Sequence, residues 1–290
     1  MTHDELIARA EALAPVLRER AETAAKMRRM PDETMADLKA NGFFRVLQPK
    51  RFGGYELSPQ TLFDLQITLG AACPSTAWVL GVVAVHSWQL ALFDEQAQQE
   101  VWGEDTDVVI SSSYMPVGKV KRVEGGFRFS GRWGFSSGSD HCDWAFLGGF
   151  VPVESGPPDM RTFLIPRADY TLEDTWHVSG LKATGSKDVV IDDVFVPEHR
   201  THKLIDGFRC KNPGNAVNDA PLFRLPFGQV FVRSVSTTII GIAQGMLNEY
   251  VALMRGRVSR ATGGKAKENG YAQHVAAEAM AVIDGARLVL

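Results

Sequence analysis

The chain has 290 residues, of which 45% are hydrophobic and 22% are charged, and its formal net charge is −3. This composition is typical of a soluble globular protein that is large enough for two or three packed layers. The charges are spread along the chain, which argues against a nucleic-acid-binding surface. The longest apolar run, around residues 78–85, is too short to cross a bilayer, and no basic-then-apolar signal peptide opens the chain. We therefore expect a protein without a membrane or nucleic-acid partner.

The cysteines and histidines give no sign of a metal centre or of a disulfide framework. The three cysteines are odd in number and widely spaced, and the histidines share no ligand spacing. Reduced thiols are typical of the cytoplasm. We expect a cytoplasmic protein with no bound metal.

The first hundred residues show the period of amphipathic helices. Apolar residues recur at helical spacing from Leu6 to Leu17, with charged residues between them. Further helices are predicted to start near Pro31 and Ser58, where proline and capping residues occur, and to cover residues 74–93. The sequence therefore predicts a helical N-terminal region.

Residues 108–200 change to the pattern of short strands. The alternating segments 120–123 and 127–129 flank Glu124-Gly125-Gly126, which predicts a hairpin. Further strands are predicted over residues 144–150, 161–165 and 189–196. Because no helices separate these strands, an antiparallel barrel or sandwich is favoured over a βαβ sheet. No Gly-x-Gly-x-x-Gly motif follows a strand, so a Rossmann site is not expected.

The helical period returns from about residue 227. One long helix is predicted over residues 232–253 and another over residues 274–290. Two amphipathic helices alone cannot bury both of their apolar faces. We therefore expect that the chain stops inside a helical bundle, as a fragment, a truncated product or part of a swapped oligomer. The predicted domains are a helical domain over residues 1–104, a β domain over 105–222 and an incomplete helical bundle over 223–290.

The segment most informative about function covers residues 130–149. Within it, Trp133 and Phe135 are followed by Ser136, Ser137 and Gly138. Aromatic rings supply stacking area, hydroxyls supply hydrogen bonds, and glycine lets backbone N–H groups approach a ligand closely. This combination indicates the wall of a site for a planar heteroaromatic cofactor. The alternative is an ordinary β-turn that carries aromatic residues by chance.

Five motifs occur in one order along nearly the whole chain. They are RRMPDETMADLKANGFFRVLQPKRFGG, STAWVLGVVAVHSWQLALF, ISSSYMP, RWGFSSGSDHCDW and LKATGSKDVVIDDVFVPEHR. Together with the helical, β and helical layout, they resemble the acyl-CoA dehydrogenase superfamily. Within it they are similar to the oxygenase components of two-component flavin-dependent aromatic hydroxylases, including those that act on a phenolic seco-steroid and on p-hydroxyphenylacetate. The steroid type is the nearer of the two.

The resemblance implies both a fold and an activity. The fold is α+β, with an N-terminal helical domain, a central antiparallel β-barrel or sandwich and a C-terminal helical bundle. The activity is that of a monooxygenase that takes reduced FMN or FAD from a separate reductase. The adduct of the reduced flavin with O2, a C4a-hydroperoxyflavin, hydroxylates a phenolic substrate at the position ortho to its hydroxyl. Such reactions belong to aromatic catabolism. The resemblance also implies a homotetramer.

The family's motifs place the flavin between the β domain and the helices. By position in these motifs, Ser137 matches the serine at flavin N5, where a hydroxyl can form a hydrogen bond without carrying charge. Arg257 matches an arginine in contact with the flavin phosphate, although the VSRAT run differs from the family's usual one. The other matched flavin positions are Trp78, Ser112, Ser113, Tyr114, Phe135 and Ser136.

The resemblance also assigns residues to the substrate. His86 and Ser112 match the pair that meets the phenol oxygen, and a histidine with a pKa near neutrality is a possible base there. His86 follows Trp78 by about two helical turns, so both can lie on one face of a helix. Gly228 takes the place of an arginine of the p-hydroxyphenylacetate enzyme, which argues against that substrate.

Two other interpretations remain open. An acyl-CoA dehydrogenase-like enzyme with tightly bound FAD would need a carboxylate base, and no residue here matches one. A non-catalytic, truncated relative would bind neither oxidised nor reduced flavin. Protein that is yellow as isolated would favour the dehydrogenase, whereas selective binding of reduced flavin would favour the oxygenase.

Overall fold

The N-terminal region is helical, as its periodicity predicts. The computed structural model describes residues 1–260 and 263–290. A capping box starts the first helix: the Glu5 N–H donates to the Thr2 hydroxyl, and the Thr2 N–H donates to the Glu5 carboxylate. The helices are α1 (His3–Met27), α2 (Asp32–Ala40), α3 (Pro59–Gly70), α4 (Pro74–Leu90) and α5 (Glu95–Trp102).

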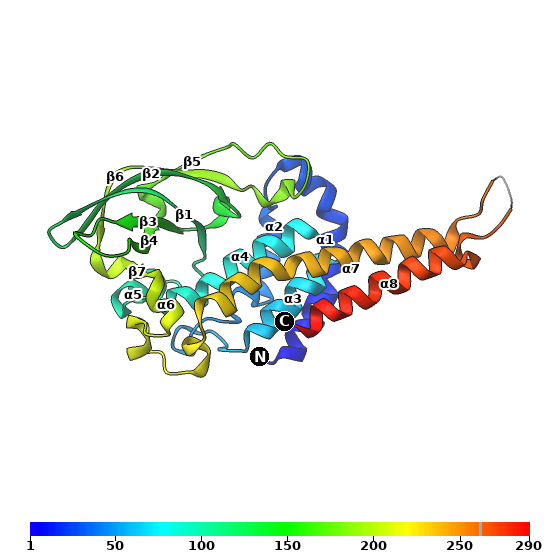
Figure 1. The fold of residues 1–290 in the computed structure, drawn as a ribbon, viewed down its shortest axis with the longest axis horizontal. Coiled ribbons are helices and arrows are strands. Elements are labelled where there is room, and N and C mark those ends of the chain that lie inside the picture. Colours follow the sequence, from blue (N-terminus) through cyan, green and yellow to red (C-terminus); the bar gives the residue numbers. More distant parts are fainter. Residues whose placement is uncertain (261–262) are drawn as a thin grey trace.

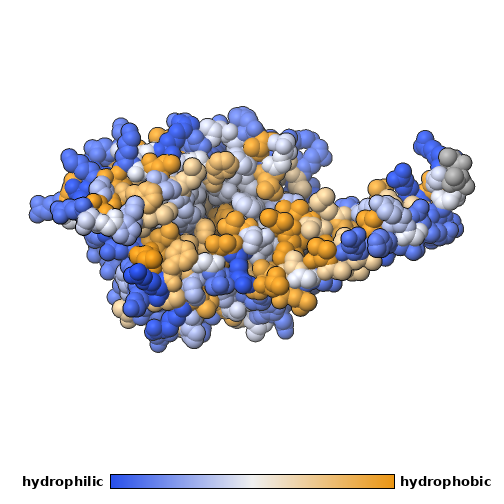
Figure 2. Space-filling model, in the orientation of Figure 1, coloured by the Kyte–Doolittle hydropathy of each residue, from blue (hydrophilic) through white to orange (hydrophobic). Residues whose placement is uncertain are grey.

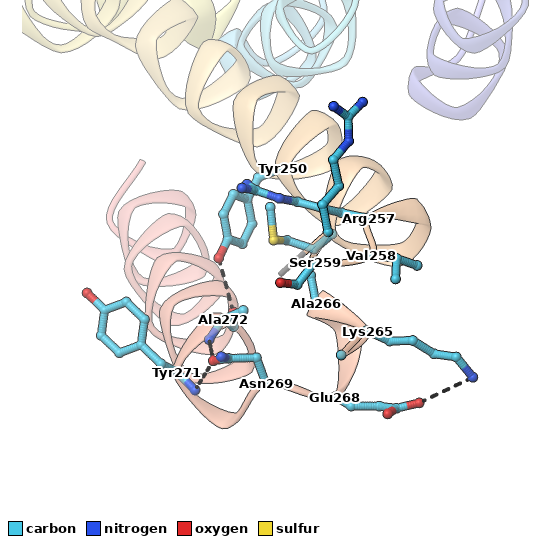
Figure 3. A pocket seen from close by; sticks show the side chains of 13 residues that line it. Tyr250, Arg257, Val258, Ser259, Lys265, Ala266, Glu268, Asn269, Tyr271 and Ala272 are labelled. Atoms are coloured by element: carbon cyan, nitrogen blue, oxygen red, sulfur yellow. Dashed lines mark hydrogen bonds and ion pairs between the residues drawn. The ribbon is translucent and has the colours of Figure 1, made fainter. Parts of the chain in front are cut away.

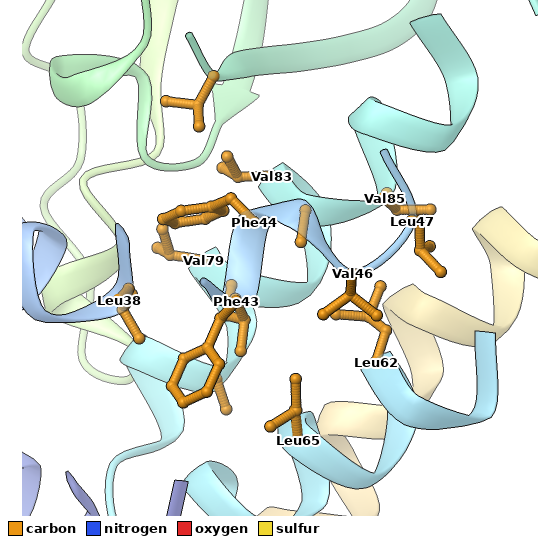
Figure 4. Packing of buried hydrophobic residues seen from close by; sticks show 14 of the residues in the cluster. Leu38, Phe43, Phe44, Val46, Leu47, Leu62, Leu65, Val79, Val83 and Val85 are labelled. Carbon is orange, nitrogen blue, oxygen red and sulfur yellow. The ribbon is translucent and has the colours of Figure 1, made fainter. Parts of the chain in front are cut away.

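Helix α4 lies at the centre of the molecule. Nearly all of its residues are buried, since it packs against α3 and α7 on one side and approaches β1 on the other (Figure 1). Phe43 and Phe44, from the segment between α2 and α3, pack among buried residues of α3 and α4 such as Leu62 and Val79 (Figure 4). This packing places α4 against the β domain.

The predicted strands are confirmed, and they form one seven-stranded sheet. Its order is β5-β6-β2-β1-β3-β4-β7. The predicted hairpin joins β1 to β2 through Glu124 and Gly125, and Gly125 takes the left-handed conformation with φ 75°. The strands are β1 (Ile110–Val123), β2 (Gly126–Ser136), β3 (Trp144–Val151), β4 (Asp159–Pro166), β5 (Thr171–Glu173), β6 (Lys187–Pro197) and β7 (Thr201–Lys203).

The sheet curls upon itself, in agreement with the predicted barrel or sandwich. Phe129 on β2 stacks on Phe163 of β4 with 4.2 Å between the ring centroids, although two strands separate β2 from β4 in the sheet order. In a flat sheet three strand spacings would amount to about 14 Å. One pair departs from the antiparallel prediction, because β1 and β3 run parallel. Strand β2 runs back toward the start of β1, and residues 137–143 then bring the chain to the other edge of β1 at that end, so β3 runs in the same direction as β1.

The C-terminal part consists of two antiparallel helices. A π-helical turn, η9 (Gly228–Val232), leads into α7 (Arg233–Gly256), and α8 (Gly270–Leu288) runs back beside α7 (Figure 1). Helix α7 packs against α3 and α4 near its start, and its far end projects from the body with α8. Within the described residues, Gly228–Gly256 is the one helix whose length and composition would suffice to cross a bilayer, a test that core helices also pass. The short helix α6 (Leu204–Arg209) precedes this region.

Candidate functional site

A cavity of about 320 Å³ lies between α4, β1, the end of β2 and η9. This volume is within the range of small-molecule sites. Nine residues line it: Trp78, Val82, Ser112, Ser113, Tyr114, Met115, Phe135, Ser137 and Phe231. None of these nine carries a charge. Three are serines and four are aromatic, a combination that suits a flat ring with polar edges.

Two regular elements supply most of the wall. Trp78 and Val82 are four residues apart on α4 and therefore lie on one helix face. On β1 the pairing with β3 shifts between Ser113 and Gly118, so the strand leaves its partner beside the cavity. Such irregularities are common next to functional sites because they redirect side chains.

The turn after β2 brings Ser137 to the cavity. Phe135, at φ 65°, takes a left-handed conformation that is strained for an aromatic residue, and its ring lies exposed at the rim. The Gly138 N–H donates to the Thr184 carbonyl over 2.8 Å. A Cβ on Gly138 would lie 2.9 Å from Val79 on α4, so glycine permits the close approach of the turn to that helix.

The buried Ser137 hydroxyl is the most fully hydrogen-bonded group at this wall. The Trp78 Nε1–H donates to it over 3.0 Å, and the Ser186 hydroxyl lies 2.7 Å away. Two residues that the motifs assigned to the flavin are therefore in direct contact, although 59 positions separate them in the chain. Ser136, the neighbour assigned with them, is fully buried and is not among the lining residues.

His86 is fully buried on α4 beside this cavity. Its Nδ1–H donates to the Ile110 carbonyl over 2.6 Å, which leaves Nε2 as an acceptor with no partner among the described residues. Burial lowers the pKa of His86 to about 4, so the expectation of a near-neutral value is wrong. The ring contacts Tyr114 and Phe231, which line the cavity, but His86 itself does not line it.

Of the residues around His86, sequence reasoning named Tyr114 but missed Phe231 and Gln89. Phe231 packs edge-on against Tyr114 with 4.7 Å between ring centroids, and the Tyr114 hydroxyl donates to Gln89 of α4. Burial raises the pKa of Tyr114, so this hydroxyl keeps its proton. Phe231 reaches the cavity because η9 adds a π-turn before α7, and no local sequence signal announces such a turn.

Arg257 lies far from the cavity of its own chain. Phe231 precedes α7 and Arg257 follows it, and the 24 residues of that helix span about 36 Å. At that end, Arg257 lines a separate cavity of about 1100 Å³ between α7 and α8 (Figure 3). The structure therefore does not bring Arg257 together with Ser137 within one chain.

The residues at the cavity fit the ring system of a flavin. Uncharged aromatic and aliphatic walls suit the ring faces, and Ser137 supplies a polar atom at the edge. The nine lining residues offer no cation for a phosphate. Within the described part of the chain, no three His, Cys, Asp or Glu side chains gather into a metal site.

Known proteins share both the sequence and the fold. The model of the acyl-CoA dehydrogenase N-terminal domain matches residues 3–106, and that of the C-terminal domain matches residues 234–290. The chain is 45% identical over 279 residues to the flavin-dependent monooxygenase oxygenase subunit HsaA of Rhodococcus jostii, covering 96% of this chain and 73% of that protein.

Two further comparisons agree. The oxygenase component of an FADH2-dependent resorcinol hydroxylase of Rhizobium sp. is 37% identical over 294 residues, covering 99% of this chain and 72% of that protein. The crystal structure of the 3-HSA hydroxylase from Rhodococcus sp. RHA1 superposes with a TM-score of 0.93 at 44% identity, covering 98% of this chain and 74% of the other. The chain thus belongs to the acyl-CoA dehydrogenase superfamily and, within it, to the oxygenase components of flavin-dependent monooxygenases, which use reduced flavin.

Proposed function

We propose that this protein hydroxylates a phenolic substrate ortho to its hydroxyl, with reduced FMN or FAD delivered by a separate flavin reductase. The observation that carries the proposal is the contact between Trp78 and Ser137 at the wall of the uncharged cavity. It joins two segments that the family's motifs assign to the flavin. The names of the relatives, which include oxygenase components acting on resorcinol and p-hydroxyphenylacetate, support the phenolic substrate.

In this proposal the lining residues hold and shelter the flavin ring. When bound, reduced flavin supplies the electrons that activate O2. Trp78 and Phe135 offer ring faces for stacking, and Val82 and Phe231 exclude water from the reacting face. Ser137 forms the hydrogen bond at N5, and Ser112, Ser113 and Tyr114 line the remaining wall.

His86 and Ser112 are proposed to bind the substrate phenol. The Nδ1–H bond to Ile110 fixes the tautomer, so the unpartnered Nε2 can accept a hydrogen bond from a phenol O–H when the rings of Tyr114 and Phe231, which contact His86 at the cavity, shift to admit it. Buried polar atoms without a partner are rare in folded proteins, which supports a ligand role for this nitrogen. Because burial lowers the pKa of His86, the imidazolium is disfavoured. His86 therefore orients the phenol by accepting a hydrogen bond and does not take up its proton.

The dehydrogenase alternative has less support at this cavity. Abstraction of a proton next to a thioester carbonyl needs a carboxylate base. The nine lining residues include no aspartate or glutamate. The lining therefore favours the hydroxylase.

We also propose a homotetramer in the cytoplasm, in which Arg257 contacts the flavin phosphate of a second copy. Support for association comes from the apolar side chains that gather over α7 and α8 (Figure 2). Support for the role of Arg257 comes from the length of α7, which separates it from the cavity of its own chain. The three free cysteines are consistent with a reducing compartment.

The test is an anaerobic titration of the purified protein with reduced and oxidised FMN and FAD, followed by mixing with O2 and a panel of phenols. We expect tighter binding of the reduced form and a product heavier by one oxygen atom. Ser137→Ala should raise the peroxide released per flavin oxidised by about ten-fold, because the hydrogen bond at N5 is lost. The matched control is Ser87→Ala, which removes a buried hydroxyl that donates to the Phe44 carbonyl away from the cavity. Binding of neither form, or complete conversion of O2 to peroxide without product, would refute the proposal.

A further inference from the structure

Behind Ser137, a row of hydroxyl groups leads away from the cavity. The Ser137 hydroxyl lies 2.7 Å from that of Ser186, which in turn lies 2.7 Å from that of Thr184. The Thr184 hydroxyl lies 3.0 Å from the carbonyl oxygen of Leu181. All three hydroxyl side chains are buried, so bulk water does not compete for these bonds.

The carbonyl at the end of the row favours one direction for the hydrogen bonds between the hydroxyls, each of which either oxygen could donate. A carbonyl oxygen has no proton, so Thr184 donates to Leu181. Each hydroxyl carries a single proton. Because the Thr184 hydroxyl uses its proton to donate to the Leu181 carbonyl, it accepts a hydrogen bond from the Ser186 hydroxyl. The Ser186 hydroxyl in turn accepts one from the Ser137 hydroxyl.

This direction leaves Ser137 with one remaining capacity. Its proton points to Ser186, and one of its two lone pairs accepts the Trp78 Nε1–H over 3.0 Å. The other lone pair is free at the cavity wall. Ser137 is therefore an acceptor, and not a donor, toward any ligand in the cavity.

Backbone geometry holds both ends of the row in place. Leu181, at φ 51°, and Phe135, at φ 65°, are non-glycine residues in the left-handed conformation, which costs free energy and is concentrated at functional sites. The Gly138 N–H donates to the Thr184 carbonyl, so the turn that carries Ser137 is tied to the segment that carries Thr184. The Leu181 carbonyl also accepts from the Trp176 indole over 3.2 Å, which anchors the acceptor end.

We infer that Ser186 and Thr184 are positioning residues that make Ser137 select the reduced flavin over the oxidised one. The inference rests on the proposed function, which places Ser137 at flavin N5. In reduced flavin N5 carries a hydrogen and can donate to Ser137. In oxidised flavin N5 has only a lone pair, so two acceptors face each other and the bond is lost. A selectivity of this kind lets the spent cofactor leave and a new reduced one enter.

The test is the ratio of the dissociation constants of oxidised and reduced flavin, measured by anaerobic titration of wild type, Ser186→Ala and Thr184→Val. Ser186→Ala frees the Ser137 proton, and Thr184→Val lets Ser186 donate to Ser137, so in both variants Ser137 can donate to oxidised N5. We expect oxidised flavin to bind about five-fold more tightly in each, the effect of one hydrogen bond, with reduced flavin nearly unchanged. The midpoint potential of the bound flavin should fall by about 20 mV, which is a five-fold change in the ratio of dissociation constants converted for a two-electron couple.

Two controls separate this effect from general damage to the fold. Thr184→Ser keeps the hydroxyl and should retain the wild-type ratio. Ser87→Ala removes a buried hydroxyl outside the row and should also leave the ratio unchanged. Thr184 and Ser186 act in one row, so either variant tests the inference if the other fails to fold.

The outcomes distinguish this inference from the proposed function. If Ser137→Ala weakens the binding of reduced flavin, while Ser186→Ala and Thr184→Val keep the wild-type ratio, the inference is wrong and the proposed function stands. If Ser137→Ala leaves the affinity for reduced flavin unchanged, the placement of Ser137 at N5 is wrong and the inference fails with it, whereas the proposed hydroxylation fails only if no flavin binds or no product forms. A ratio of dissociation constants that decreases in Thr184→Val and returns to the wild-type value in Thr184→Ser supports the inference, since the Thr184 hydroxyl is joined to that of Ser137 through Ser186.

Discussion

His86 and His202 are two histidines that the fold keeps neutral. Both are buried, and burial lowers the pKa of each to about 4. His86 donates to the Ile110 carbonyl, and His202 forms a hydrogen bond with Asn212 over 2.9 Å. These neutral partners, and the charge of Asp206 near His202, offset only part of the cost of burying an imidazolium, so burial decides the pKa of both histidines.

This neutrality predicts how stability depends on pH. Between pH 6.5 and pH 4 the unfolded chain binds protons at these two histidines, whereas the folded protein does not. The free energy of unfolding should therefore fall as the pH is lowered through this window, by about 1 kcal/mol per pH unit for each histidine. Urea denaturation at pH 7, 6 and 5 measures the slope.

Variants at single histidines show how much each histidine contributes to the dependence of the free energy of unfolding on pH. His86→Gln and His202→Gln should each lower the slope by about 1 kcal/mol per pH unit, whatever the absolute stability of the variant. The exposed His274 provides the control, because His274→Gln leaves the two buried imidazoles in place. An unchanged slope in both buried-site variants would contradict the prediction.

Among the helices, α7 decides where one wall of the cavity lies. It crosses α3 at glycines: a Cβ on Gly241 would lie 2.7 Å from the Ile67 carbonyl, and one on Gly245 would lie 2.8 Å from the Ala71 carbonyl. The Gln66 amide donates to the Ser234 carbonyl over 2.6 Å and so sets the register of the crossing. Because η9 continues directly into α7, this register also positions Phe231.

Gly241→Ala should separate the two helices. The new Cβ meets backbone atoms of α3 that cannot move aside, so we expect a loss of about 1–3 kcal/mol in the free energy of unfolding. Gly285→Ala is the matched control, because Gly285 on α8 has open space around its Cβ position. That change should raise stability by about 0.5–1 kcal/mol through helix propensity. Equal effects of the two changes in chemical denaturation would refute the close crossing.

At the scale of the whole molecule, an exposed apolar stripe runs along the projecting helix α7. Val232, Ile239, Met246 and Leu253 follow one another at intervals of seven residues along η9 and α7, and each is between 57% and 69% exposed. Seven-residue spacing places side chains in a line that suits packing against another helix. Figure 2 shows this apolar surface continuing over α8.

If a second copy covers this stripe, two negative charges on it should prevent association. We expect wild type to elute at the mass of four chains in size exclusion with light scattering, and Ile239→Glu/Met246→Glu to elute as smaller species. Ala12→Glu/Thr23→Glu adds the same charge at exposed positions of α1 and should leave the mass unchanged. A wild-type monomer would contradict the proposed tetramer.

Local sequence patterns were sufficient to predict much of the architecture and to indicate the family. Apolar residues predicted α1, α4, α7 and α8, and proline and capping residues predicted α2 and α3. The Glu124-Gly125 turn predicted the β1–β2 hairpin, since helix and turn formation depend on neighbouring residues. The motif around Ser137 indicated a flavin site, and the relatives bear out the family. The division into three domains stays a prediction.

Contacts between distant segments needed the folded chain. The parallel pairing of β1 with β3, the contact of Trp78 with Ser137 and the row through Ser186 to Thr184 join residues that lie tens of positions apart. The low pKa of His86 likewise depends on burial by several elements at once, and Phe231 reaches the cavity through a π-turn whose cause is packing. Periodicity describes which face of an element is apolar, but the neighbour that each side chain meets follows from how all the elements pack together.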